Sequence, residues 1–231
     1  NLHVDGKGYD IKLVTPEYFD SSLNLTFKTL SQGGAGDVAI SSATDRPVPI
    51  YSIADGVKAL EVTGADSSGN IVGVEDGPAI RLSVKVARED LSENITQVKL
   101  TGKQTDFGIS HTDTPNDTSN VVYLTRVDGL LIENTFNENF ISRSVVSDNV
   151  EYIINIKGQA QSLLKDGVFS DLNEAEDFLA RNIGIKTSKD VSGELNLTYD
   201  ITTVDEDNPD PLISNNKTQS VELKINVKNI N

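Results

Sequence analysis

The stretch Gly193-Glu194-Leu195-Asn196-Leu197-Thr198-Tyr199 decides the fold, because a similar stretch occurs earlier in the chain. Its earlier copy is Ser21-Ser22-Leu23-Asn24-Leu25-Thr26-Phe27, at an offset of 172 positions (195 − 23). In both copies leucine alternates with polar residues, as in a half-buried β-strand. Similarity at a fixed spacing is typical of modular chains, and the alternative is a chance match of a common strand pattern. The same offset also carries Ile11, Leu13 and Thr15 onto Ile183, Ile185 and Thr187.

Strand patterns continue along most of the chain. Short alternating or β-branched runs are separated by Gly, Asp, Asn and Pro, which is typical of all-β domains. We therefore predict an all-β fold made of β-sandwich modules. The predicted strands are 9–15, 23–30, 48–53, 57–62, 80–86, 95–101, 120–126, 151–156, 195–204 and 220–227.

Two stretches, 158–167 and 170–181, break the strand pattern. The first is rich in Ala, Gln and Leu and ends at a glycine, as many helices do. In the second, Ser170 or Asp171 can cap a helix that runs to about Arg181. We predict two short helices that cover one end of the β core.

The composition excludes several kinds of protein. The chain has 231 residues and contains no cysteine, methionine or tryptophan. Without cysteine there is no disulfide, no thiolate metal site and no thiol nucleophile. We find no apolar run long enough to span a bilayer and no signal-peptide pattern. The absence of methionine leads us to expect a segment of a longer polypeptide.

The net charge is −15, from 35 acidic and 20 basic residues. Such a chain repels phosphate backbones and anionic lipids, so we predict neither nucleic acid nor membrane insertion. The acids gather in turns with Gly, Ser, Asn and Pro. Carboxylates in turns can be plain solvated loops, or they can bind Ca²⁺, which prefers oxygen ligands. We predict Ca²⁺ as the cofactor, and the acidic turns are 54–56, 66–70, 73–78, 88–94, 113–117 and 205–210.

A family resemblance is carried by three motifs, Gly73-Val74-Glu75-Asp76-Gly77-Pro78, Asp90-Leu91-Ser92-Glu93 and Asp190-Val191-Ser192-Gly193-Glu194-Leu195-Asn196-Leu197-Thr198. In this order they resemble the recurring signature of cadherin-like and immunoglobulin-like modules in bacterial RTX adhesins, which are exported by type I secretion. The resemblance implies immunoglobulin-like or cadherin-like β-sandwiches with a short helical insertion. It also implies an extracellular, calcium-rigidified rod on the bacterial cell surface, in which adjacent modules of the chain contact one another.

The resemblance also implies calcium ligands. They are Asp55 at the joint between modules, the pair Glu75 and Asp76, the acids Asp90 and Glu93, and Asp205 and Asp207 between the last two strands. The second motif departs from the family pattern, which carries further acidic and glycine positions where this chain has Leu91 and Ser92.

The predicted modules are unequal. Residues 1–55 form the C-terminal part of a preceding module, residues 56–72 a junction, and residues 73–231 an enlarged module with a surplus at about 106–177. Function often lies in loops grafted on such a scaffold. The surplus contains aromatic residues, Tyr152 among them, in what we expect to be loops. Its candidate ligand-binding residues are Asp113, Asp117, Tyr123 and Asp128.

Two functions stay open from the sequence. The chain is a calcium-dependent cell-surface adhesin segment whose surplus binds a peptide or glycan on a host or neighbouring cell, or it is a structural extender with no ligand of its own. A pocket with an exposed calcium in the surplus favours the first function, and a compact plug against the sandwich favours the second.

An enzyme is not predicted. The two histidines, His3 and His111, are far apart in the sequence. The chain has no Gly-x-Ser-x-Gly elbow and no phosphate-binding loop. A glycosidase could use paired acids, but its cleft is expected to contain tryptophan, which this chain lacks.

Overall fold

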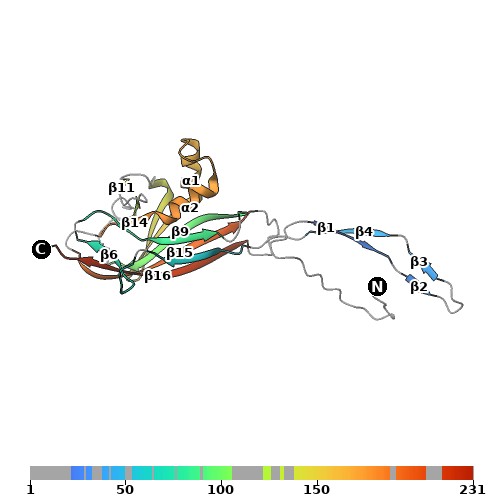
Figure 1. Cartoon of the computed structure of the whole chain (residues 1–231), viewed down its shortest axis with the longest axis horizontal. Coiled ribbons are helices and arrows are strands. Elements are labelled where there is room, and N and C mark those ends of the chain that lie inside the picture. The colour runs from blue at the N-terminus through green and yellow to red at the C-terminus, as the bar shows by residue number, and fades with distance from the viewer. Residues whose placement is uncertain are drawn as a thin grey trace. The chain divides into compact units, whose positions relative to one another are not determined.

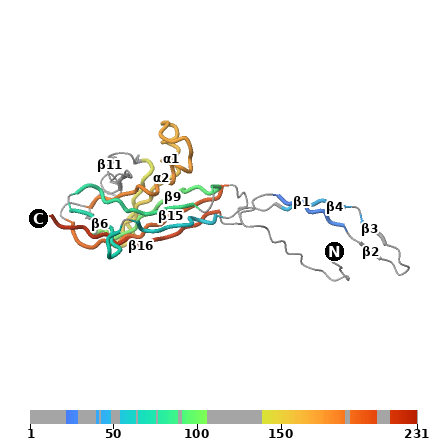
Figure 2. Tube along the Cα trace, viewed as in Figure 1, coloured from blue at the N-terminus to red at the C-terminus, as the bar shows by residue number. Residues whose placement is uncertain are grey.

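The computed structural model describes residues 22–28, 30–32, 38–41, 43–49, 54–63, 65–75, 77–88, 91–105, 122–125, 131–132, 138–187, 191–206 and 215–230. The chain divides into two compact units, which Figure 1 draws as ribbons and Figure 2 as a trace. Unit 1 contains residues 1–52 and 207–210, and unit 2 contains residues 53–206 and 211–231. Most described residues lie in strands, so the predicted β-rich fold is confirmed. Within these ranges, no helix is long and apolar enough to cross a membrane.

Unit 1 contains two pairs of antiparallel strands. Strand β1 (Ser22–Phe27) pairs with β4 (Thr44–Pro49), and β2 (Leu30–Gln32) pairs with β3 (Val38–Ile40). Every side chain of β1 is exposed or half-buried. The predicted strand 9–15 lies outside the described residues.

Unit 2 is built on a six-stranded sheet with the strand order β12-β13-β9-β15-β16-β6. Neighbouring strands run antiparallel except β6, which is parallel to β16. Smaller sheets have the orders β11-β10-β14-β7 and β5-β8. The strands are β5 (Val57–Val62), β6 (Ile71–Val74), β7 (Ile80–Arg81), β8 (Val84–Arg88), β9 (Glu93–Lys103), β10 (Val122–Thr125), β11 (Leu131–Ile132), β12 (Ile141–Val146), β13 (Asn149–Asn155), β14 (Ile183–Ile185), β15 (Gly193–Asp205) and β16 (Asn216–Lys228).

The core of unit 2 follows from alternation along its long strands. In β15 every second residue from Leu195 onward is buried, and in β16 the same holds for Leu223, Ile225 and Val227. Alternate side chains point to opposite faces of a strand, so one face of the sheet is apolar. The apolar face predicted for these two strands is confirmed.

Two helices cover part of this core. Helix α1 (Ile156–Lys165) packs on β9, and α2 (Leu172–Arg181) packs on β8 and β9. A short 3₁₀ turn, η1 (Glu138–Phe140), precedes β12. Both predicted helices are confirmed within two residues at each end. The Asn155 side chain caps α1 by accepting from the Gly158 N–H at 2.8 Å, and Asp171 caps α2. Such caps satisfy amides that have no partner inside the helix.

The structure differs from three sequence predictions. The predicted strand 80–86 is split into β7 and β8, and Ser83 between them has a φ of 52°. Tyr152 lies in no loop: it is a fully buried residue of β13, an inner strand of the main sheet, so the predicted strand 151–156 is confirmed and the loop expectation for Tyr152 is wrong. Residues 149–177 of the predicted surplus are therefore part of the core framework. The predicted junction 56–72 contains all of β5 and the start of β6, and it belongs to unit 2.

Candidate metal centre

Two buried acidic residues lie opposite each other where β9 begins and β15 ends. Glu93 and Asp205 are opposite residues of these antiparallel strands, and each is only 1% exposed. Opposite residues in an antiparallel pair have Cβ atoms about 5 Å apart. Like charges placed opposite each other destabilise a sheet, and carboxylate oxygens are ligands that Ca²⁺ prefers. This pair is therefore a candidate cation site.

The Glu93 carboxylate also binds the backbone where the chain enters unit 2. Its Oε1 accepts hydrogen bonds from the amides of Asp55 and Gly56, the second at 3.0 Å. Gly56 has a φ of 90°, which favours glycine. A Cβ there would lie 2.4 Å from Oε1 of Gln219. These contacts hold the backbone of Asp55 and Gly56 against the Glu93 carboxylate.

Strand β16 holds the same entry segment from the other side. Lys217 Nζ donates to the Asp55 carbonyl at 2.7 Å. The Gln219 side chain accepts from the amide of Val57 and donates to its carbonyl, the latter at 3.0 Å. The Gln219 side chain thus makes the pair of hydrogen bonds to Val57 that a neighbouring backbone would make in a β-bridge. Residues 55–57 are therefore held against both β9 and β16.

A largely buried ion-pair network contacts the backbone of Glu93. Arg88 donates to the Glu93 carbonyl, to Glu176 Oε2 at 2.7 Å and to Asp177 Oδ1 at 2.8 Å. Glu176 Oε2 also accepts from the Ile95 amide at 2.8 Å. Burial raises the pKa of the Glu176 carboxyl, and Arg88 opposes this shift. The network connects α2 to the strand that carries Glu93.

Glu75 lies at the opposite end of the sheet. It follows β6, is 4% exposed, and its amide donates to the carbonyl of Lys228 at 2.9 Å. Lys217, which contacts Asp55, lies 11 residues earlier on β16 (228 − 217), about 36 Å along an extended strand. The predicted calcium ligands are therefore divided between the two ends of unit 2, with Asp55, Glu93 and Asp205 at one end and Glu75 at the other.

The remaining predicted residues cannot be assigned to either end. Tyr123 lies in β10, where its backbone is opposite Gly184. The others lie outside the described residues, namely Asp76, Asp90, Asp207, Asp113, Asp117 and Asp128. Among the described residues, no three acidic, histidine or cysteine side chains are grouped closely enough to hold a metal on their own. A cation at the Glu93–Asp205 pair would therefore need backbone carbonyls, water or acids from outside those ranges as further ligands, which Ca²⁺ accepts.

The sequence analysis missed Arg88, Glu176, Lys217 and Gln219. A signal for Lys217 and Gln219 was present, because both continue the alternation of Leu223, Ile225 and Val227 toward the start of β16. Glu93 and Asp205 likewise occupy core-facing phases of their strands. These four polar residues in the buried phase of a strand are therefore a signal that the sequence contained.

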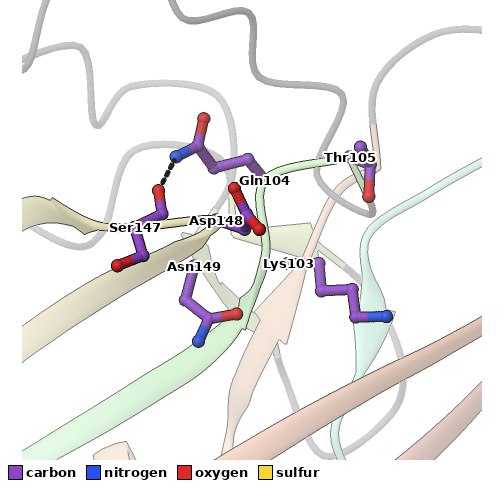
Figure 3. A pocket seen from close by; sticks show the side chains of 6 residues that line it. All are labelled: Lys103, Gln104, Thr105, Ser147, Asp148 and Asn149. Carbon is purple, nitrogen blue, oxygen red and sulfur yellow. Dashed lines mark hydrogen bonds between the residues drawn. The ribbon is translucent and has the colours of Figure 1, made fainter.

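A separate shallow cavity lies at the far end of β9, beside the turn between β12 and β13 (Figure 3). The Gln104 side chain crosses it and donates to the Ser147 carbonyl at 2.9 Å. None of the predicted ligand-binding residues is among the side chains that line it, which are Lys103, Gln104, Thr105, Ser147, Asp148 and Asn149.

Comparison of the chain with models of protein families, with curated proteins and with solved structures gives no match.

Proposed function

We propose that this chain is a calcium-binding segment of an extracellular bacterial adhesin, built from immunoglobulin-like or cadherin-like β-sandwich modules. The opposed, buried carboxylates of Glu93 and Asp205 carry the proposal. Ca²⁺ between them would replace mutual repulsion by attraction to a shared ion, and would stabilise the folded state by mass action.

The ligand chemistry favours a hard cation. The whole chain offers no cysteine and only two histidines, so the usual donors of a zinc site are scarce. Further acids lie close to the pair in the sequence. Asp90 precedes Glu93 by three positions and Asp207 follows Asp205 by two (93 − 90 and 207 − 205). Ca²⁺ takes six to eight oxygen ligands, including carbonyls and water.

Of the two roles considered from the sequence, the described residues support the structural extender. Residues 149–181 contribute an inner strand and two helices to the core, as a compact plug would. Tyr152, Ile156 and Leu179 are fully buried there. Binding of a peptide or glycan stays a prediction for the earlier part of the surplus, which contains Asp113, Asp117 and Asp128.

Thermal unfolding at matched ionic strength tests the proposal. At a calcium concentration of about 100 times the dissociation constant, binding adds about 2.7 kcal/mol. We expect the unfolding midpoint of unit 2 to rise by about 5–10 °C relative to excess chelator. Magnesium, which demands a tighter octahedral geometry, should give a much smaller shift.

Two matched variants locate the effect. Glu93→Gln removes one of the two buried charges and should abolish the calcium shift. Glu194→Gln makes the same chemical change at an exposed position of β15 and should leave the shift intact. No shift with calcium in the unmodified chain, or an equal loss in both variants, would overturn the proposed site.

A further inference from the structure

We infer that unit 2 resists mechanical force, through a shear clamp between its first strands and its last strand. The inference rests on strand topology and does not depend on bound calcium. The clamp consists of the Gln219–Val57 contact and the parallel pairing of β6 with β16.

The chain first enters unit 2 at one end of β16 and finally leaves it at the other end. On entry, Asp55 and Val57 bind Lys217 and Gln219 near the start of that strand. On exit, the chain passes Lys228 at its other end, which lies beside β6 next to the end marked C (Figure 1). A pull on the two chain ends is therefore directed along β16 and not across it.

The residues of the entering chain contact β16 in the same order in which both segments run. Val57 binds Gln219, and Ile71 pairs with Ile225, six positions further along β16 (225 − 219), or about 20 Å. The pairing continues from Ile71 to Val74, and the Glu75 amide extends it by donating to Lys228. The entering chain thus runs in the same direction as β16 past both points of contact.

This arrangement loads the contacts in shear. Pulling the entry segment one way and β16 the other makes the ladder bonds of β6 share the force, so several must break together. Pulling two points at the same end of the pair loads the bonds one after another. Each bond contributes only about 1 kcal/mol, so their simultaneous loading determines the mechanical resistance. The network at Arg88 and Glu176 anchors β8, which pairs with β5, against α2.

Force spectroscopy on the full chain with two sets of attachment points tests the clamp. Because the chain contains no cysteine, introduced cysteines give unique attachment sites. The first set uses cysteines added at both chain ends, and the second uses the N-terminal cysteine with Asn215→Cys, just before β16. Full extension of unit 2 releases on the order of 600 Å, which identifies its unfolding event.

We expect the unfolding force between the chain ends to exceed the force in the second geometry by about twofold or more, since forced unfolding follows the barrier along the pulled direction. Equal forces, or a weaker response between the chain ends, would overturn the inference. Both measurements are made with calcium and with chelator. A geometric difference that persists in chelator supports the clamp, whatever the fate of the proposed metal site.

A side-chain variant gives a second, independent readout. Gln219→Ala removes the two bonds to Val57 and should lower the force between the chain ends more than the force in the second geometry. Ser220→Ala removes one surface bond, to Asp200, from the outer face of the same strand and should change neither. If Gln219→Ala lowers both forces in equal proportion, the residue acts only on stability and the clamp is wrong.

Discussion

Unit 1 and unit 2 contain the same strand motif in different surroundings. In unit 1, Leu23 and Leu25 are half-buried, and β1 has one described neighbour, β4. In unit 2, the equivalent Leu195 and Leu197 are 3% and 1% exposed, because β15 lies between β9 and β16 with the apolar core on one face. Both copies pair with a later antiparallel strand, in which Leu23 is opposite Val48 and Leu195 is opposite Ile225.

The difference separates what the motif specifies from what its context adds. Alternation of leucine with polar residues is enough for a strand and for its antiparallel partner. Burial needs flanking strands and further elements that pack on the apolar face. In unit 2, β9 and β16 flank β15, and the two helices contribute residues to the core on that face. Ion pairs such as Arg88–Glu176 fix α2 in place, and no local strand pattern specifies them. Substitutions in the ion pair, the apolar core, the entry turn and the helix cap therefore measure how much each contributes to the stability of unit 2.

The largest effect is expected from the ion pair beneath α2. Arg88→Met leaves Glu176 buried without its charge partner and should destabilise unit 2 by roughly 3–5 kcal/mol. Urea unfolding, followed with a probe in each unit, should show this loss in unit 2 and no change in unit 1. The double variant Arg88→Met with Glu176→Leu should recover much of the stability, since an apolar pair can replace a buried ion pair.

Lys85→Met is the matched control for that change. It breaks the exposed pair between Lys85 and Glu61, whose side chains are 55% and 64% exposed, and exposed pairs contribute little. An equal loss in the control and in Arg88→Met would contradict the interpretation that α2 is held by the buried network.

The next effect compares the two copies of the motif directly. Leu197→Ala should cost about 2–5 kcal/mol in unit 2, because it opens a cavity in a filled core. Leu25→Ala, the equivalent change in unit 1, should cost much less, since that side chain is already partly in contact with water. Denaturant titration of both variants checks the ratio, and equal losses would mean that unit 1 buries its copy as fully as unit 2.

A smaller effect is expected where the chain enters unit 2. Gly56→Ala adds a Cβ to a residue with a φ of 90°, and the new atom meets Oε1 of Gln219 at 2.4 Å. We expect a loss of roughly 1–3 kcal/mol. Gly69→Ala is the control, because its φ is 81° but open space surrounds the site. Equal losses of stability in the two variants would mean that backbone strain alone causes the effect, and that the contact with Gln219 contributes nothing to it.

The sequence predicted those parts of the fold that depend on local pattern. Long strands with a clear period, such as β15 and β16, and helices with recognisable caps were located to within a few residues. Short strands such as β6, β11 and β14 were missed, because two to four residues show no period, and only neighbours in space define them. The position of β13 inside the main sheet also depends on long-range pairing.

The candidate site was predicted only in part, for the same reason. The family resemblance implied Asp55, Glu93 and Asp205 as calcium ligands, and the fold places these three residues at one end of unit 2. The resemblance also implied Glu75, which lies at the other end. Spacing along the chain cannot tell which acids lie at the same end of unit 2, because strand pairing and register determine which turns lie close together. Arg88 and Glu176 are 88 positions apart (176 − 88) and meet only through packing of α2.

The smallest effect decides which residue begins α2, where the sequence allowed Ser170 or Asp171. In the structure the Asp171 side chain accepts a hydrogen bond from the Glu174 amide at 2.9 Å. Asp171→Ala should therefore cost about 1 kcal/mol, the usual effect of losing an N-cap, and Ser170→Ala should be close to neutral. Urea unfolding of unit 2 measures both. If Ser170→Ala is the more costly change, α2 begins one residue earlier. Its contact with Arg88 would then need a different account, because a shift of the first turn changes which side chains of α2 face β8.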